Sequence, residues 1–370
     1  MDSYISAIGI ANPPHRIKQS QIAEFMIKAH DFKQVQEKTR LEALYRATGI
    51  EYRYSVLEDY GLETGFKFYP NSPDLEPFPR TEDRSLLYRA EALELSQNAI
   101  KNCLNKVPDF EVDNVSHLIT VSCTGMYAPG LDIDLVKELG LSTAIKRTAV
   151  NFMGCYAAFN AIKLADSIVK ADEKAHVLVV CVELCSIHFQ KNPSEDNLLA
   201  NSLFGDGAAA MLVSNQPQSQ ISIQPQAFHN DLLFGGENEM AWAIGDFGFE
   251  MKLSAYVPDI IQKGIATLLE QLFAKTGKTD ETVDYYAVHP GGKKILKVIE
   301  EEIGISKERN SYAHEVLRQY GNMSSPTILF VLEKIMEVLT IEDNHKEILA
   351  LAFGPGLTLE SASFKIINRA

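Results

Sequence analysis

Runs of apolar residues with strand character recur along the chain and alternate with longer segments of helical pattern. Several runs are nearly continuous in apolar residues, as expected for strands that are buried on both faces of a sheet. The expected strands are Tyr4–Ile10, His117–Cys123, Val177–Val182, Ala208–Val213, Tyr285–Val288, Ile348–Phe353 and Ala362–Ile367. The expected helices are Arg84–Asn102, Ala157–Lys170, Ser254–Lys275, Lys293–Glu302 and Thr327–Leu339. This alternation predicts an α/β protein in which helices cover a mixed sheet.

The chain has 370 residues, which suits two half-domains or one large domain. Its most linker-like segment is Asn215–Ile221, so we place an N-terminal half at 1–220 and a C-terminal half at 221–370. Four prolines lie within Phe66–Pro79, which predicts an irregular excursion on the surface.

Composition describes an ordinary globular protein and excludes some classes of partner. Hydrophobic residues make up 46% and charged residues 23% of the chain, and 35 basic against 49 acidic residues give a net charge of −14. That charge disfavours binding to nucleic acid or anionic lipid. A CoA thioester is also anionic, and such a substrate would need a locally basic mouth.

Nothing in the sequence suggests secretion or a membrane span. Met1–Gln19 has no basic segment followed by an apolar core, and no apolar run is long enough to cross a bilayer. Five cysteines, an odd number spread thinly, favour reduced thiols over a disulfide framework. We therefore expect a cytoplasmic protein with no integral membrane segment.

Three residues sit in glycine-bearing contexts of the kind that present a side chain to a reacting centre. Cys155 lies in Gly-Cys-Tyr-Ala-Ala, His289 in His-Pro-Gly-Gly directly after an expected strand, and Asn322 in Gly-Asn-Met-Ser-Ser-Pro. Taken singly, each has a structural alternative: a buried cysteine, a satisfied core histidine, and a turn or helix-capping asparagine. Together, a thiol, an imidazole and a carboxamide suit thioester chemistry, in which a thiolate holds an acyl group and the other two stabilise an enolate or oxyanion.

The segment that follows Cys155 gives a local reason to expect a reactive thiol. Ala157–Lys170 is apolar on most faces, which is typical of a helix buried inside a domain. Cys155 precedes its first turn, where unpaired amides and the helix dipole favour an anion. The sequence therefore predicts a lowered pKa for the Cys155 thiol.

Other candidate motifs have simpler structural explanations. Cys181, Cys185 and His188 could be mistaken for metal ligands, but a single C-x3-C after a strand favours core or cavity lining, and we expect no metal. Asp206, in Gly-Asp-Gly-Ala, is expected to be a structural turn residue. Gly354-Pro355-Gly356 permits close backbone approach but has no phosphate-binding pattern.

The order of these motifs resembles the type III polyketide synthases, the chalcone synthase family of the thiolase superfamily. The resemblance rests on Asn-Phe-Met-Gly-Cys155-Tyr, Ser202-Leu-Phe-Gly-Asp-Gly-Ala-Ala-Ala, Val288-His-Pro-Gly-Gly, Tyr320-Gly-Asn-Met-Ser-Ser and Phe353-Gly-Pro-Gly-Leu-Thr-Leu-Glu. It extends in order from Ile8-Gly-Ile-Ala-Asn-Pro to the C-terminus. It implies a thiolase-like fold of two similar halves in alternating helix and sheet layers, and a homodimer.

The resemblance also assigns roles to the three residues. Cys155 would receive the starter acyl group from CoA, while His289 and Asn322 would hold the thioester carbonyl of malonyl-CoA during decarboxylation. The substrates would be acyl-CoA and malonyl-CoA, with no further cofactor. Phe204 would match the phenylalanine that gates the passage between the CoA tunnel and the cavity.

The expected cavity departs from the plant pattern and favours a bacterial-type enzyme. Met251 stands at a second gating position, and Trp242, the only tryptophan, stands where plant enzymes have a small glycine. The other expected cavity residues are Cys123, Thr124, Cys185, Ile187, His188 and Ser324. Lys38, Arg40 and Arg46 are nearby candidates for gripping CoA.

The resemblance thus predicts an acyltransferase that extends an acyl-CoA with malonyl-CoA and cyclises the product. A fatty acyl starter giving an alkylpyrone or alkylresorcinol is the first expectation, followed by a malonyl or aromatic starter. The alternatives are a 3-ketoacyl-carrier-protein synthase III-like enzyme, which performs a single condensation, and a non-catalytic partner subunit that keeps the fold.

Overall fold

A computed structural model describes residues 1–369, apart from the side chain of residue 280. A nine-stranded sheet in the order β11-β12-β13-β8-β1-β7-β6-β4-β5 runs through the molecule. Its strands are β1 (Tyr4–Ala11), β4 (His117–Ser122), β5 (Lys146–Asn151), β6 (His176–Leu184), β7 (Asp206–Ser214), β8 (Ile221–Leu232), β11 (Tyr285–Val288), β12 (Glu347–Gly354) and β13 (Thr358–Asn368).

The sheet is made of two halves with the same pattern of strand directions. In the first half β5, β4 and β6 are parallel, and β7 and β1 follow antiparallel. In the second half β11 and β12 are parallel, and β13 and β8 follow antiparallel. The halves meet between β1 and β8, which share one pair of residues, Ile5 and Ile223. This is the expected thiolase-like arrangement of two similar halves.

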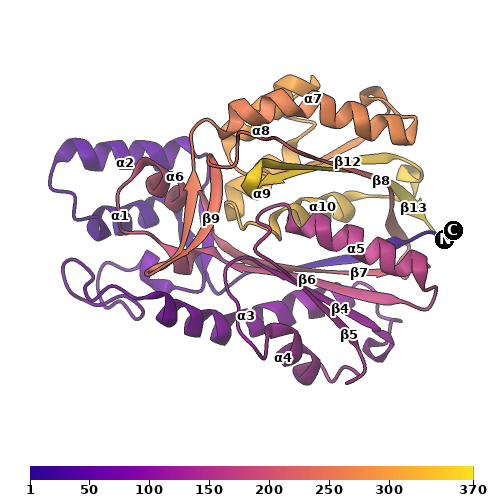
Figure 1. Cartoon of the computed structure of the whole chain (residues 1–370), viewed down its shortest axis with the longest axis horizontal. Helices are drawn as coiled ribbons and strands as arrows, with labels where there is room; N and C mark the ends of the chain where they lie inside the picture. Colours follow the sequence, from indigo (N-terminus) through magenta and orange to yellow (C-terminus); the bar gives the residue numbers. More distant parts are fainter. Residues whose placement is uncertain (370) are drawn as a thin grey trace.

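Helices fill the space between the half-sheets and cover both outer faces (Figure 1). The enclosed helices are α5 (Ala157–Ala171) and α10 (Thr327–Val338), with α9 (Ser311–Tyr320) beside α10. Outside the first half lie α3 (Thr81–Leu104) and α4 (Leu131–Glu138), and outside the second lie α7 (Val257–Thr276) and α8 (Lys293–Ile303). Eight residues of α5 and eight of α10 are buried, which explains why both segments are apolar on most faces.

A group of smaller elements covers one end of these layers, at the left of Figure 1. It contains the helices α1 (Gln19–Ala29), α2 (Val35–Ala47) and α6 (Glu195–Leu203), and two strand pairs. The pairs are β2 (His15–Lys18) with β3 (Tyr52–Ser55), and β9 (Met240–Gly245) with β10 (Gly248–Leu253). This cap lies over the end of the layers at which the site described below is found.

All seven expected strands and all five expected helices are present, with ends shifted by a few residues. Phe66–Pro79 contains no helix or strand, as expected, but it is not a simple surface excursion. Phe66, Tyr69 and Phe78 are buried and pack with Phe25 or Phe189, so aromatic contacts anchor the segment to the first half.

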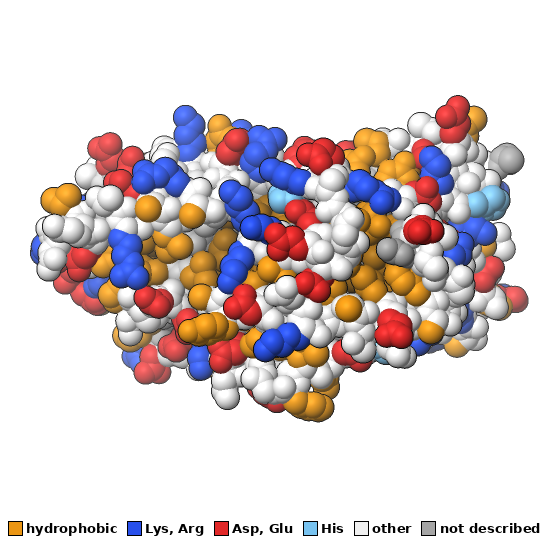
Figure 2. Space-filling model, turned by 90° about the horizontal axis from the view of Figure 1, so that it is seen from above, with side chains coloured by type: hydrophobic (Ala, Val, Ile, Leu, Met, Phe, Trp, Pro, Cys, Tyr) orange, Lys and Arg blue, Asp and Glu red, His pale blue; other side chains and the backbone are white. Residues whose placement is uncertain are grey.

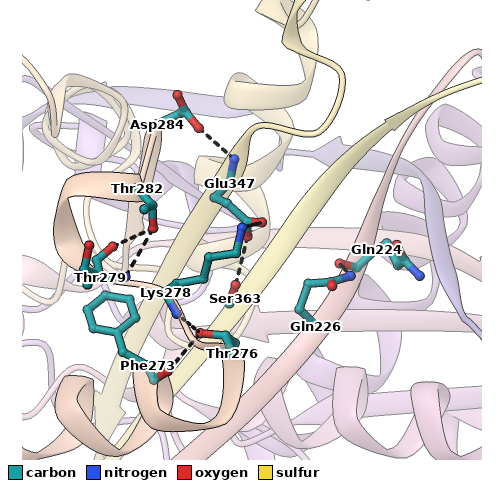
Figure 3. A network of polar contacts seen from close by, with 10 residues as sticks. All are labelled: Gln224, Gln226, Phe273, Thr276, Lys278, Thr279, Thr282, Asp284, Glu347 and Ser363. Atoms are coloured by element: carbon teal, nitrogen blue, oxygen red, sulfur yellow. Dashed lines mark hydrogen bonds and ion pairs between the residues drawn. The ribbon is translucent and has the colours of Figure 1, made fainter.

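A polar network holds β11 at the far edge of the second half (Figure 3). The nearly buried carboxylate of Glu347, on β12, lies 3.0 Å from Lys278 Nζ and accepts a 3.1 Å hydrogen bond from Ser363 Oγ on β13. The Glu347 amide donates to Asp284 Oδ2 at 2.9 Å, directly before β11. These bonds fix the strand whose end carries His289.

Candidate active site

Cys155 lies in a tight turn between β5 and the enclosed helix α5. Phe152 and Gly154 both have positive φ angles, 61° and 83°. A Cβ on Gly154 would come within 2.3 Å of Pro355 Cδ, so only glycine fits this close approach. The sequence interpretation of close backbone approach at Gly354-Pro355-Gly356 is confirmed, because a Cβ on Gly354 would lie 3.2 Å from the Cys155 amide nitrogen.

His289 directly follows β11, and its amide donates to Leu351 O at 2.8 Å. The ring is fully buried and lies edge-on to Phe353, with ring centroids 5.7 Å apart. Neither Nδ1 nor Nε2 has a hydrogen-bond partner among the described residues. Buried polar atoms are normally paired, so a ring with two free nitrogens is suited to interaction with a substrate.

Hydrogen bonds of both the main chain and the side chain fix the position of Asn322. Its amide donates to Leu203 O and its carbonyl accepts from Gly205 N, each at 2.9 Å, in a parallel bridge with Phe204. Its Oδ1 accepts from Ser324 N at 2.8 Å, and Cys155 Sγ lies 4.0 Å from this oxygen and also 4.0 Å from the NH2 group.

That NH2 group joins the other two parts of the site. Asn322 Nδ2 lies 4.0 Å from Cys155 Sγ and donates to Gly291 O at 3.4 Å. Gly291 belongs to the turn after His289, and a Cβ built on it would lie 3.7 Å from His289 Cδ2. The three residues, separated by 134 and 33 positions in sequence, are therefore brought to one place.

Burial sets the charges of the site. Burial raises the pKa of Cys155 to about 11, and the carboxylate of Glu183 also raises this pKa. Hydrogen bonds from Ser324 and Asn322 lower the same pKa but do not cancel the effect of burial. Burial alone lowers the pKa of His289 to about 3. The expectation of a lowered thiol pKa was wrong for this structure, because desolvation outweighs the start of α5. A neutral thiol and a neutral imidazole occupy the site.

Glu183, at the end of β6, is a buried acid that the sequence analysis missed. Its Oε2 accepts from Cys123 N at 2.9 Å and from Thr124 Oγ1 at 2.8 Å, and its Oε1 accepts from Ser325 Oγ at 2.5 Å. Burial raises its pKa, against these hydrogen bonds. The sequence did offer one sign of it, because Glu183 is the single acidic residue near the end of an otherwise apolar strand.

Seven of the expected cavity residues line one pocket, next to Gly154 and Pro355, with about 260 Å³ between its atoms. They are Cys123, Thr124, Cys185, Phe204, Trp242, Met251 and Ser324. Four of them also line a larger pocket of about 560 Å³, which includes His188 and reaches Ile22 and Met26 on α1. We call these two pockets, which share four lining residues, the chamber. Ile187 lines neither pocket, because its side chain is fully buried in the hydrophobic core of the first half.

Trp242 and His188 form a rigid part of the chamber wall. Trp242 Nε1 donates to Cys123 O at 2.7 Å. The His188 ring stacks on Phe249 with centroids 4.3 Å apart, accepts from Phe249 N at Nδ1 and therefore donates from Nε2 to Thr124 O. Both His188 nitrogens are thus occupied by the main chain. No group of three or more potential metal ligands occurs among residues 1–369.

The candidate CoA-gripping residues Lys38, Arg40 and Arg46 are exposed on α2. Arg40 pairs with Glu195 at 3.0 Å, and Arg46 lies 3.9 Å from Glu42. Lys293, at the start of α8, was not considered from the sequence, and its Cδ packs within 3.4 Å of a Cβ built on Gly49. Lys and Arg side chains gather on the face in Figure 2 over the region where Figure 1 places α2 and α8.

A buried thiol, imidazole and carboxamide at the junction of two similar halves define an acyltransferase of the thiolase-like class. Residues 2–217 match the family described as chalcone and stilbene synthases, N-terminal domain, and residues 225–368 match the corresponding C-terminal domain. The chain belongs to this family, and it is a type III polyketide synthase, a decarboxylating, condensing acyltransferase.

Individual relatives agree over nearly the whole chain. It is 31% identical to the alpha-pyrone synthesis polyketide synthase-like Pks18 of Mycobacterium tuberculosis, over 99% of this chain and 91% of that protein. PKS-I of the brown alga Ectocarpus siliculosus superimposes with a TM-score of 0.90 at 29% identity, covering 99% and 98% of the two chains. The C-terminal type III domain of Steely1 from Dictyostelium gives 0.88 at 27% identity, covering 99% of each chain.

Among residues 1–369, no helix combines the length and apolar character needed to cross a membrane.

The Glu183 carboxylate makes a testable contribution to the reactivity of Cys155. Glu183→Gln keeps the side-chain size and one acceptor oxygen but removes a negative charge that disfavours the thiolate, so the Cys155 pKa should fall below about 11. We expect faster alkylation of Cys155 by iodoacetamide at each of a series of fixed pH values, followed by mass spectrometry. Glu173→Gln, an exposed site, is the matched control. An unchanged or slower alkylation rate in Glu183→Gln would contradict the claim that the Glu183 charge disfavours the Cys155 thiolate.

Proposed function

We propose that this synthase loads an acyl-CoA starter on Cys155, extends it with malonyl-CoA and cyclises the product. The observation that carries the proposal is the placement of Asn322 Nδ2 4.0 Å from Cys155 Sγ, beside a histidine whose two nitrogens are free for a substrate. The parts needed are a thiol, an imidazole and an amide, and no bound cofactor takes part.

Loading begins with proton transfer from the Cys155 thiol to the neutral His289 imidazole. A buried thiolate or imidazolium alone is costly, but an adjacent pair has no net charge. The sulfur then attacks the acyl-CoA carbonyl, the carbon–sulfur bond to CoA breaks, and the leaving CoA thiolate takes the proton from His289. The acyl group remains on Cys155, and both neighbouring side chains are neutral again.

In the extension step, His289 and Asn322 stabilise the negative charge of an enolate. When the carboxylate of malonyl-CoA leaves as CO2, the electron pair of the broken carbon–carbon bond moves onto the thioester oxygen as an enolate. N–H groups of His289 and Asn322 stabilise that oxygen in a site without bulk water. The enolate carbon attacks the acyl-Cys155 carbonyl, and the Cys155 thiolate leaves. No general base is required in this step.

A fatty acyl starter and an alkylpyrone, alkylresorcinol or related phenolic product are our first proposal for specificity. The chamber is bounded largely by apolar side chains, among them Met251, Phe204, Ile22 and Met26. The relative that is 31% identical is named for alpha-pyrone synthesis. The apolar lining supports an apolar starter, and the name of the relative supports a pyrone product.

A graded panel of acyl-CoA starters with malonyl-CoA tests this function. We expect cyclised products from fatty acyl starters by mass spectrometry, and an acyl adduct on intact wild-type protein. Cys155→Ala should give no adduct and no product, because the attacking sulfur is absent. If only aromatic starters, or malonyl-CoA alone, yield product, the fatty acyl preference is wrong, and a single two-carbon extension would favour the synthase III-like alternative.

Trp242 should limit the size of the product. Trp242→Ala removes a large indole that lines both pockets of the chamber, so we expect products lengthened by further malonyl units or acceptance of longer starters. Phe247→Ala, at an exposed aromatic in the turn between β9 and β10, is the matched control. Product masses that stay unchanged while turnover is retained would show that the indole does not set length.

We also propose a homodimer and a cytoplasmic location. The location rests on five reduced, buried cysteines. For the dimer, β5 is the last strand of the sheet and most of its residues are exposed, a template for pairing that proteins normally cover. The exposed apolar residues Met126, Ile133 and Met153 belong to segments next to β4 and β5.

Light scattering on the native protein tests the dimer. We expect twice the chain mass of 41.2 kDa, and a shift toward the single-chain mass in Met126→Asp/Ile133→Asp, because charges would be buried at the interface. Ile341→Asp, an exposed isoleucine near the start of β12, should leave the mass unchanged. A wild-type protein of single-chain mass would rule the homodimer out.

A further inference from the structure

Arg53, on β3, places a guanidinium group inside the protein next to the chamber. Its side chain is almost fully buried, and it lines the larger pocket together with Phe204 and Cys185. Its charge faces the aromatic ring of Tyr45 at 5.7 Å and the carboxylate of Asp206. Burying a charge is costly, so such a group is retained where the fold uses its hydrogen bonds.

Those hydrogen bonds are directed at the end of α6, the helix that leads into the gate residue Phe204. Arg53 Nη1 donates to Asn201 O at 2.9 Å and also to Phe204 O. Arg53 Nε donates to Gln19 Oε1 at 2.9 Å, and Gln19 Nε2 donates to Ser202 O at 2.7 Å. Carbonyls in the last turn of a helix have no partner within the helix, and a cation suits that end of the helix dipole.

The stem of the same side chain packs against the segment that carries Asn322. A Cβ built on Gly321 would lie 2.9 Å from Arg53 Cγ, and one on Gly205 would lie 3.4 Å from Arg53 Cβ. Gly205 and Gly321 flank the bridge in which Phe204 pairs with Asn322. One side chain therefore contacts both strands of that bridge, on one side by hydrogen bonds and on the other by packing.

We propose that Arg53 is a positioning residue, which sets the place of Asn322 at the reacting carbonyl and of Phe204 at the gate by holding the two segments together. The inference rests on the proposed role of Asn322 in decarboxylation. It differs from a general contribution to stability, because Cys155 stands on another segment, between β5 and α5, that Arg53 does not hold. Loss of Arg53 should therefore affect the amide donor directly and the thiol only through its contact with Asn322.

The test separates these two parts of the site. In Arg53→Met the side chain keeps its bulk but loses its hydrogen bonds. We expect kcat for malonyl-CoA decarboxylation, followed as acetyl-CoA by mass spectrometry, to fall about 10-fold or more, since small misplacements of a catalytic group are costly. The rate of Cys155 alkylation by iodoacetamide should fall much less, because Ser324 also hydrogen-bonds the sulfur and lowers its pKa. Arg53→Lys, which retains the charge and can reach one carbonyl, should recover part of the decarboxylation.

Arg16→Met, an exposed arginine on the paired strand β2, is the matched control and should change neither rate. Folded Arg53→Met that decarboxylates like wild type would overturn the proposal. So would an equal fall in decarboxylation and alkylation, which indicates general disruption. If Arg53→Met does not fold, Gln19→Met, which removes one hydrogen-bond partner of the guanidinium, can replace it. Its decarboxylation rate should fall more than its alkylation rate, by a smaller factor than in Arg53→Met. A decarboxylation rate equal to that of wild type in Gln19→Met would overturn the proposal. A wild-type protein that does not decarboxylate malonyl-CoA would instead overturn the function on which this inference rests.

Discussion

Burial of α5 and α10 between the two half-sheets is the constraint on which the site depends. Both helices are apolar on nearly every face, so they are stable only when sheet covers them from two sides. Once enclosed, the turns before them meet at the same end of the layers. Cys155 precedes α5 and Asn322 precedes α10, and their side chains come within 4.0 Å. The catalytic geometry is thus a consequence of how the core is packed.

The same burial has an electrostatic consequence for the chemistry. It makes both the thiolate and the imidazolium costly when they stand alone, as the pKa of about 11 for Cys155 and of about 3 for His289 indicates. A neutral thiol is a weaker nucleophile than a thiolate, so the resting sulfur is poorly reactive. Burial also leaves two unpaired nitrogens on His289 to meet an enolate oxygen. Low polarity therefore weakens the resting nucleophile and strengthens the donors that act on the charged intermediate.

The sequence predicted those parts of the structure that local pattern determines. Cys155, His289 and Asn322 could be found because each needs glycines beside it, and buried strands such as β6 and β12 could be found because their apolar runs are continuous. Strand β5 was missed because it is an exposed edge, and β8 because Gln, His and Asn interrupt its apolar residues. The direction of the Cys155 pKa was wrong because desolvation comes from segments distant in sequence. Arg53 and Glu183 were missed for the same reason, since their partners lie between 34 and 151 positions away.

Phe204 and Asn322 occupy one bridge between two segments, and this couples selection to chemistry. A shift of the main chain at Phe204, the proposed gate, would also move Asn322, the proposed amide donor, because Asn322 N and O are both hydrogen-bonded to that segment. Changes of substrate range are therefore more easily made by side chains that do not share this bridge. Trp242 and Met251 line the chamber from the separate β9–β10 pair and take no part in the bridge, so they can vary in size without breaking the main-chain bonds that hold Asn322.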